Sequence, residues 1–408
     1  VAFMCVFFFH GQPGAIFPVF QKFAAWGWSG VELFFVLSGY LITLLLLREK
    51  SELGSISVKN FYARRVLRIW PVYFLVLAGL SLFPLTLTHW GNMQNYWEFM
   101  RRLILPFSLF VGNFGLLQQG LTLQNFCSAW PLRYYCYVAL LLPLWSVCVE
   151  EQFYLVWPLL LAVVRRTRAL WWTIGSIALL GMASRYALYL WSVKLHVGHP
   201  LYYLNTLCHV DGLMFGAALA LAEHQYPGWA KGIVSGWKGW AAFAAAIGTL
   251  SVIALFARDL NSHHYSIVLL MSVVSLSYAL LLLLTLNWSP LKTVLSQRFI
   301  ASVGRITYAM YIFHFCMIDS SGWICDPICR LLNGVLPRSG ASAELFLTQI
   351  SWVIHLTVAL IMTWVAAQVS WNLLEKHVLA LRRFFRRDGA QPPVPPLSTA
   401  PQQLAGMR

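Results

Sequence analysis

The sequence predicts an all-α, polytopic membrane protein with about ten transmembrane helices. Of its 408 residues, 59% are hydrophobic and only 11% are charged, and the mean hydropathy is +0.66. This composition excludes a chain that folds in water. Because backbone groups find no hydrogen-bond partner in lipid, each spanning segment is expected to be a helix of roughly 20 residues.

Eleven apolar segments follow one another along the chain. They lie at residues 1–10, 31–47, 70–88, 103–118, 139–164, 170–191, 207–223, 239–257, 266–286, 301–318 and 349–373. The first segment is too short to cross a hydrocarbon core of about 30 Å at about 1.5 Å per residue. The sequence is therefore expected to begin within the first helix, which is truncated.

The net charge of +15 comes from basic clusters between the apolar segments. The positive-inside rule places the clusters Arg48–Arg68, Arg165–Arg168, Lys292–Arg305 and Arg382–Arg387 in the cytoplasm. An even number of crossings must then separate each pair of clusters. Three apolar segments lie between the first two clusters, at 70–88, 103–118 and 139–164, so only two of them can cross. Because 70–88 and 139–164 are longer, 103–118 is expected to enter the membrane or lie inside without spanning it. Ten crossings remain, with both termini cytoplasmic. Orientation and anionic membrane lipid explain the charge, so no nucleic-acid partner is expected.

Residues 1–387 are expected to form one integral-membrane domain. Residues 388–408 are rich in Pro, Gln and Ala without apolar periodicity, which predicts a disordered cytoplasmic tail. The eight cysteines show neither a CxxC pair nor a zinc-finger spacing. No metal site is therefore expected.

Glu150 and Glu151 lie near the middle of the apolar segment 139–164. An ionised carboxylate in hydrocarbon costs ~2.5–3.5 kcal/mol on insertion scales, so at least one of the pair is expected to be functional. Neighbouring residues of a helix point about 100° apart and therefore face different partners. A salt-bridged helix contact is the alternative for either residue.

His10 ends the first apolar segment. A neutral imidazole there could take a proton from a sugar hydroxyl, and a carboxylate on a facing helix could fix its tautomer. A buried, hydrogen-bonded histidine is the alternative, since His209, His314 and His355 also lie in apolar segments.

Arg64, Arg65 and Arg68 stand at the cytoplasmic end of segment 70–88. Arg65 and Arg68 are spaced i, i+3 on one helical face, and their planar guanidinium groups suit bidentate binding of phosphate. Such a pair would hold the 3′-phosphate and diphosphate of coenzyme A. An ordinary positive-inside cluster is the alternative, but lysine would serve that purpose equally well.

Polar and small residues interrupt three further segments. Arg185 and Asp211 could form a structural ion pair or bind a sugar. Gly30 and Ser38-Gly39 permit either close helix contact or passage of a thin pantetheine arm.

Six ordered motifs resemble those of the acyltransferase 3 family of integral-membrane O-acyltransferases. They stand at Gly30–Ile42, Phe61–Pro71, Trp145–Tyr154, Asp211–Gly216, Gly304–His314 and Ser370–Glu375. The resemblance implies a multi-pass protein of the cell inner membrane. It also implies transfer of an acyl group, most often acetyl, from cytoplasmic acyl-CoA to a hydroxyl of a glycan, a lipid-linked saccharide or another small acceptor.

By position, the resemblance implies that His10 is the general base and that Glu150 is the helix carboxylate that orients it. Arg65 and Arg68 match the RxxR pair of the family and are expected to bind acetyl-CoA. Further candidates are Arg64 and Ser38 for the donor, and Arg185, Asp211 and Glu151 for the acceptor. The family pattern also has an arginine eleven positions before the histidine, which falls outside this sequence.

Alternatives to this enzyme remain open. A transporter or flippase of a lipid-linked saccharide could use the same buried charges for binding, although it needs no cytoplasmic arginine cluster. An O-acyltransferase for a small molecule such as a macrolide is a third hypothesis. Direct transfer and an acyl-histidine relay are equally compatible with the residues, and the acceptor, acyl length and oligomeric state cannot be inferred.

Overall fold

The computed structural model describes residues 1–11, 18–86, 97, 100–118, 141–195, 200–260, 264–335 and 341–385. Within these ranges the secondary structure is helical, without strands. The all-α prediction is thus confirmed. The predicted tail 388–408 lies outside the described residues.

Nine helices of 16 residues or more carry the architecture. They are α3 (Gly30–Leu53), α4 (Val58–Thr86), α10 (Leu144–Val163), α11 (Thr167–Leu195), α13 (Val210–Gln225), α15 (Trp237–Leu260), α16 (His264–Asn287), α18 (Arg298–Val335) and α19 (Ala341–Ser370) within the described part of the chain.

Shorter helices connect or cap the long ones. They are α1 (Ala2–Gly11), α2 (Pro18–Ala25), η2 (Gly27–Ser29), η3 (Met100–Ile104), α6 (Leu105–Ser108), α7 (Gly112–Gln118), α12 (Pro200–Tyr203), η4 (Thr206–Cys208), α14 (Trp229–Ile233), α17 (Ser289–Leu295), η5 (Trp371–Glu375), α20 (Lys376–Ala380) and η6 (Leu381–Phe385).

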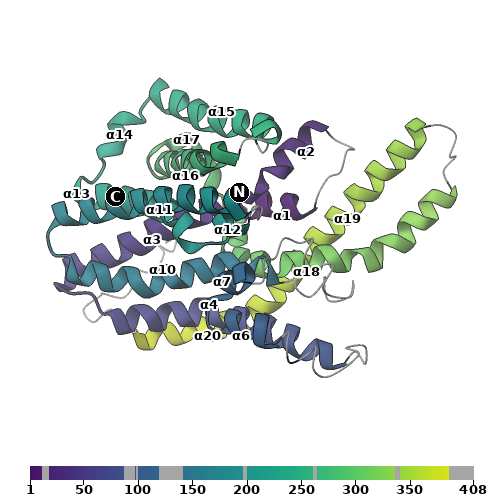
Figure 1. Ribbon diagram of the computed structural model, residues 1–408, viewed down its shortest axis with the longest axis horizontal. Helices are drawn as coiled ribbons and strands as arrows, with labels where there is room; N and C mark the ends of the chain where they lie inside the picture. The colour runs from purple at the N-terminus through teal and green to yellow at the C-terminus, as the bar shows by residue number, and fades with distance from the viewer. Residues whose placement is uncertain are drawn as a thin grey trace, which may run out of the picture.

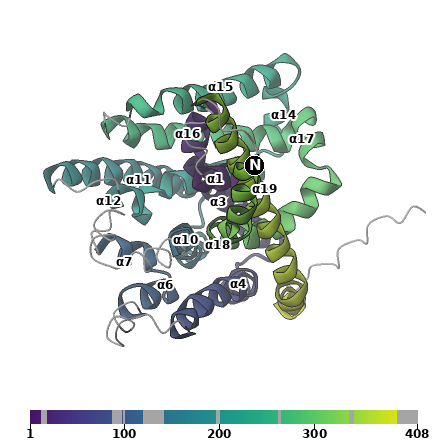
Figure 2. The ribbon, with the colours of Figure 1, turned by 90° about the vertical axis from the view of Figure 1, so that its right-hand side faces the viewer.

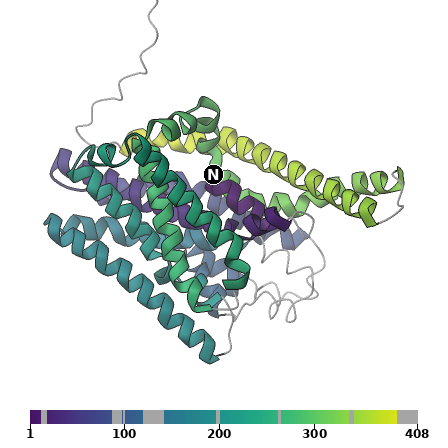
Figure 3. The same ribbon diagram turned by 90° about the horizontal axis from the view of Figure 1, so that it is seen from above.

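Most of the long helices run side by side in one bundle (Figure 1). In Figure 2, α3 lies near the centre of the molecule, with α16, α11, α10 and α18 around it. The hairpin of α18 and α19 extends beyond one end of the bundle, as the view from above also shows (Figure 3). The core is accordingly built around α3, which contacts α1, α10, α13 and α16.

The number of membrane crossings can be compared with the prediction. Each of the ten segments expected to cross is helical over most of its described residues. Seven helical stretches in the described ranges are long and apolar enough to span a bilayer, and the other three expected crossings are α1, α11 and α13. The protein is therefore a multi-pass membrane protein. The count of ten and the cytoplasmic position of both termini stay predictions.

The segment 103–118 is broken rather than a single helix. Its backbone passes from α6 to α7 through a turn in which Phe110 adopts a φ of 56°, a left-handed conformation that is uncommon for a residue with a side chain. The ring of Phe110 stacks on Tyr73 of α4, with centroids 4.7 Å apart, which holds the turn against the bundle. The segment is thus built from two short helices, and its failure to span the membrane stays a prediction.

Close packing of α3 against α13 depends on two glycines. A Cβ atom added to Gly39 would collide with the backbone carbonyl of Leu213, and one added to Gly216 would collide with that of Val36. Backbone therefore meets backbone at this crossing, as small residues permit in membrane helices. Gly39 thus serves helix contact, the first of the two roles considered for it.

Substituting Gly39 tests this contact. Gly39→Ala forces the two backbones apart, so we expect a loss of about 1–3 kcal/mol in stability and a lower melting temperature of the detergent-purified protein. Gly175→Ala on α11 is the matched control, because nothing lies within 4 Å of the added Cβ. Equal melting temperatures for Gly39→Ala and the unsubstituted protein would show that the crossing is not tightly packed.

Candidate functional site

His10, in the last turn of α1, pairs with His314 of α18. Nδ1 of His10 lies 2.8 Å from Nε2 of His314, although the two residues are 304 positions apart in sequence. Nδ1 of His314 lies 2.5 Å from the carbonyl oxygen of Tyr311. His314 is fully buried, and the ring of Phe315 packs against His10 with centroids 4.9 Å apart. The fold therefore holds both imidazoles in one orientation.

These contacts assign the protons of the neutral pair. A carbonyl oxygen only accepts hydrogen bonds, so Nδ1 of His314 carries a hydrogen and its Nε2 is an acceptor. Nδ1 of His10 must then donate to Nε2 of His314. Nε2 of His10 is consequently the unprotonated nitrogen. A lone pair of this kind can accept the proton of a hydroxyl group.

Glu150 makes its hydrogen bond to a different residue from the one predicted. Oγ of Ser38 donates to Oε1 of Glu150 at 2.6 Å, and the hydroxyl of Tyr154 donates to Oγ of Ser38 at 3.0 Å. No hydrogen bond joins Glu150 to His10 in the described residues. The reason is that α1 packs on α3 and α18, whereas α10 packs on α3 and α4. His314, rather than Glu150, is therefore the hydrogen-bond partner of His10, and the predicted catalytic role of Glu150 stays a prediction.

Tyr311 connects the histidine pair to α10. Its carbonyl oxygen contacts His314, and its hydroxyl donates to the carbonyl oxygen of Pro143 at 3.0 Å and lies 2.6 Å from Oγ of Ser146. The hydroxyl of Tyr311 thus bonds α18, one turn before His314, to the N-terminal end of the helix that carries Glu150.

Arg64 and Arg65, near the start of α4, have different surroundings. Arg64 pairs with the buried Glu49 of α3, with Nη2 and Oε2 2.9 Å apart. The guanidinium carbon of Arg65 lies 5.6 Å from the ring centroid of Tyr154, within cation–π range, and the charge of Arg65 interacts with that of Glu150. The structure therefore brings the predicted donor residues Arg65 and Ser38 to one place beside Glu150, while part of Arg64 is already engaged.

Glu151 points away from Glu150, as their adjacent positions on one helix require. Its Oε2 accepts a hydrogen bond of 3.3 Å from Nε1 of Trp70. Its other oxygen is buried and has no hydrogen-bond partner in the described ranges. No contact of Glu151 tests its predicted role in acceptor binding, which stays a prediction.

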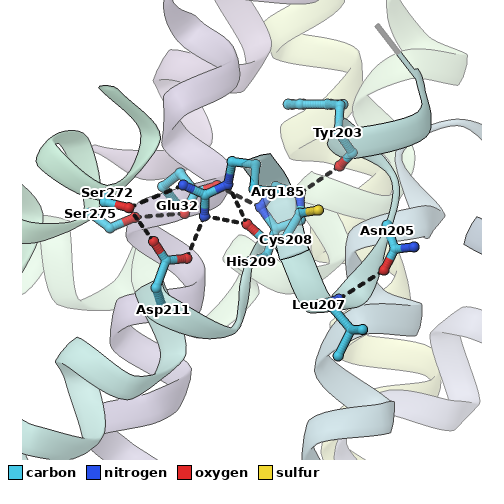
Figure 4. Close-up of polar contacts among 10 residues, drawn as sticks. All are labelled: Glu32, Arg185, Tyr203, Asn205, Leu207, Cys208, His209, Asp211, Ser272 and Ser275. Carbon is cyan, nitrogen blue, oxygen red and sulfur yellow. Dashed lines mark hydrogen bonds and ion pairs between the residues drawn. The ribbon is translucent and has the colours of Figure 1, made fainter. Parts of the chain in front are cut away.

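Arg185 and Asp211 form the ion pair that the sequence suggested. Nη2 of Arg185 lies 2.5 Å from Oδ1 of Asp211, and both side chains are completely buried (Figure 4). Ser272 donates to the second oxygen of Asp211 at 2.5 Å, and Nε of Arg185 donates to the carbonyl oxygen of Cys208 at 2.9 Å. The alternative role in substrate binding stays a prediction for both residues.

A second buried pair, Glu32 and His209, lies in the same cluster (Figure 4). Nδ1 of His209 is 2.7 Å from Oε1 of Glu32, and Ser275 donates to Oε2 at 2.7 Å. Nε2 of His209 contacts the carbonyl oxygen of Tyr203 at 2.5 Å and therefore carries a hydrogen. One further proton is shared between Nδ1 and Glu32. Either location of that proton leaves the pair neutral overall, which limits the cost of its burial.

Sequence reasoning missed Glu32 and His314 as site residues. Glu32 had a usable signal, because it is a carboxylate in the apolar segment 31–47 and the desolvation argument made for Glu150 applies to it equally. His314 also had a signal, because it ends the motif Gly304–His314, which His209 and His355 do not. In the described residues, no group of three or more His, Cys, Asp or Glu side chains is arranged to hold a metal ion.

Comparison with known sequences identifies related proteins. The family described as acyltransferase domain matches residues 1–371. A provisionally named O-acetyltransferase of Staphylococcus aureus strain COL is 24% identical over 323 residues, covering 74% of this chain and 48% of the relative. A provisionally named peptidoglycan O-acetyltransferase of Bacillus subtilis strain 168 is 26% identical over 389 residues, covering 88% of this chain and 52% of the relative.

A third relative matches a shorter stretch. O-acetyltransferase OatA of Staphylococcus aureus strain NCTC 8325 is 30% identical over 146 residues, or 36% of this chain and 22% of the relative. The chain spans about half the length of the first two relatives. No solved structure matches it.

The buried ion pair leads to a stability prediction. Asp211→Leu leaves the charge of Arg185 buried without its partner, so we expect a loss of about 3–5 kcal/mol, measured as a lower melting temperature. Adding Arg185→Met should recover part of this loss, because both charges are then absent. Arg168→Met, at an exposed position of α11, controls for the removal of a positive charge. A double variant less stable than Asp211→Leu alone would contradict the ion-pair interpretation.

Proposed function

The chain belongs to the acyltransferase 3 family of integral-membrane acyltransferases, and from this we propose that it transfers an acetyl group from acetyl-CoA to a hydroxyl group of a cell-envelope glycan or lipid-linked saccharide. The names of the relatives, O-acetyltransferase and peptidoglycan O-acetyltransferase, support this substrate class. The proposed location is the inner membrane, with the arginine cluster of α4 on the cytoplasmic side. This orientation follows the positive-inside rule.

The observation that carries the proposal is the hydrogen-bonded pair of His10 and His314. Their contacts leave Nε2 of His10 as a lone pair and aim its Nδ1 at a fixed acceptor. This is the arrangement that a general base requires, because the second nitrogen is held while the first exchanges a proton. A transporter that only binds a saccharide has no need for it.

In the proposed direct transfer, Nε2 of His10 accepts the proton of the acceptor hydroxyl as the hydroxyl oxygen attacks the carbonyl carbon of the thioester. The bond between this carbon and sulfur then breaks, and the imidazolium returns the proton to the departing thiolate. His314 accepts the hydrogen bond of the imidazolium throughout and so stabilises the charged form. Attack by Nε2 itself on the thioester is the relay alternative, which would leave an acetyl group on His10.

The donor is proposed to bind through Arg65 and Arg68. Arg65 extends from the start of α4 toward Glu150 and Tyr154, so it links the cytoplasmic end of the bundle to the interior. Glu150 then positions the donor site by balancing the charge of Arg65 and by fixing the hydroxyl of Ser38. We thus propose that Glu150 positions the donor site, in place of its predicted role of orienting His10.

Acetyl transfer can be measured directly. The purified protein is incubated in lipid nanodiscs with acetyl-CoA labelled in the acetyl group and with candidate glycans, lipid-linked saccharides and small-molecule alcohols. We expect label on a saccharide hydroxyl and a rate about 100-fold to 10,000-fold lower for His10→Ala, because general-base catalysis contributes that much. His355→Ala, which removes a partly exposed histidine of α19, is the control.

Two outcomes would overturn the proposal. A His10→Ala variant with full activity would remove the imidazole from the mechanism. Translocation of a lipid-linked saccharide without transfer of label would instead favour a flippase, and label on a macrolide alone would change the acceptor class.

Two substitutions of His314 test whether the hydrogen bond that it accepts from His10 matters for catalysis. His314→Gln places an amide oxygen near the former Nε2, where it can accept from His10, whereas His314→Asn offers its amide near the former Nδ1 only. We expect kcat to fall about 100-fold in His314→Asn and less than tenfold in His314→Gln, with KM for acetyl-CoA unchanged. Equal losses of kcat in the two variants would assign His314 a packing role instead.

A further inference from the structure

The C-terminal end of the described chain folds back onto the start of α4. Both α20 and η6 contact α4, and α20 lies beside α4 in the bundle (Figure 1). Nη1 of Arg64 donates to the carbonyl oxygen of Phe385 at 3.1 Å, and Nη2 of the same guanidinium pairs with Glu49. Arg64 thus ties η6 to α3 and α4. The basic residues of η6, which the sequence assigned to membrane orientation alone, are brought against the arginine cluster.

Arg382 of η6 is the residue that this fold places among like charges. Its side chain is partly buried, and its Nε is buried without a hydrogen-bond partner in the described residues. The charges of Arg68, Arg65 and Arg64 all act on it, and each of these interactions is repulsive. Four guanidinium groups from two distant parts of the chain therefore converge at one end of the bundle.

The nearby carboxylates leave part of this positive charge unbalanced. Glu49 is bonded to Arg64, and Glu150 interacts with Arg65. Glu375 interacts electrostatically with Arg68, and its Oε1 also accepts a hydrogen bond from the hydroxyl of Ser370. In the described ranges, the structure gives Arg382 no acidic partner of its own. Converging arginines with free N–H groups are the usual arrangement for binding phosphate, because planar guanidinium groups match its oxygens.

We propose that Arg382 completes, with Arg65 and Arg68, a binding site for the phosphate groups of the coenzyme A donor. This inference rests on the proposed function, since it assumes that the donor enters at the arginines of α4. It adds that the C-terminal segment supplies one wall of the site. The α4 cluster and η6 then bind the nucleotide end of the donor together, and the free Nε of Arg382 donates to a phosphate oxygen.

Binding of coenzyme A and of adenosine 3′,5′-bisphosphate to the full chain tests the inference without any transfer step. We expect Arg382→Gln to weaken the binding of both ligands about tenfold in calorimetric titration, since a hydrogen bond to a charged group is lost. Arg382→Lys keeps the charge without the planar fork and should bind with intermediate affinity. The matched control is Arg383→Gln, because Arg383 is exposed and stacks on Phe384 instead.

The outcomes separate this inference from the proposed function. If the unsubstituted protein binds coenzyme A and transfers acetyl groups while Arg382→Gln binds both ligands as tightly, the inference alone fails. If Arg382→Gln retains coenzyme A affinity but loses co-purifying anionic phospholipid, Arg382 contacts a lipid headgroup and the inference also fails. If the unsubstituted protein neither binds coenzyme A nor transfers label, the proposed function itself is wrong.

Discussion

The structure depends on one constraint, that polar groups inside a membrane bundle must be satisfied by other parts of the protein. Helix α3 meets this constraint at three levels. Glu32 bonds to His209 and Ser275, Ser38 bonds to Glu150, and Glu49 pairs with Arg64. Glu32 and Glu49 are roughly 25 Å apart along the helix axis, so α3 organises polar contacts through most of the bundle.

These contacts differ in what they leave available for chemistry. The cluster of Arg185, Asp211, Glu32 and His209 is buried and neutral as a whole, and it bonds the helices to one another. The histidine pair instead leaves Nε2 of His10 unprotonated, and the arginine cluster around Arg65 keeps more positive charge than the adjacent acids balance. The sites to which we assign chemistry therefore have an unprotonated nitrogen or an unbalanced charge. The cluster that bonds the helices to one another has neither.

Much of the fold could be predicted from the sequence because lipid imposes a simple rule. Apolar segments become helices, and all ten expected crossings are helical over most of their described residues. The parity of the basic clusters predicted that 103–118 does not span the membrane, but not that the segment is broken into two short helices. The pairing of helices could not be predicted, since every apolar helix offers a similar surface, and Gly39 shows its role only once Leu213 is placed against it.

The sequence by itself determined the class of protein, the positions of its helices, and the residue types that are costly in lipid, with Glu150 and the arginines of α4 among them. Only the tertiary structure decided which groups meet. It joined His10 to His314 instead of Glu150, and it brought Arg382 from the C-terminal segment to Arg65 and Arg68. The physical reason is that burial cost is a property of each residue and its local segment. A hydrogen bond between residues 304 positions apart depends on how whole helices pack.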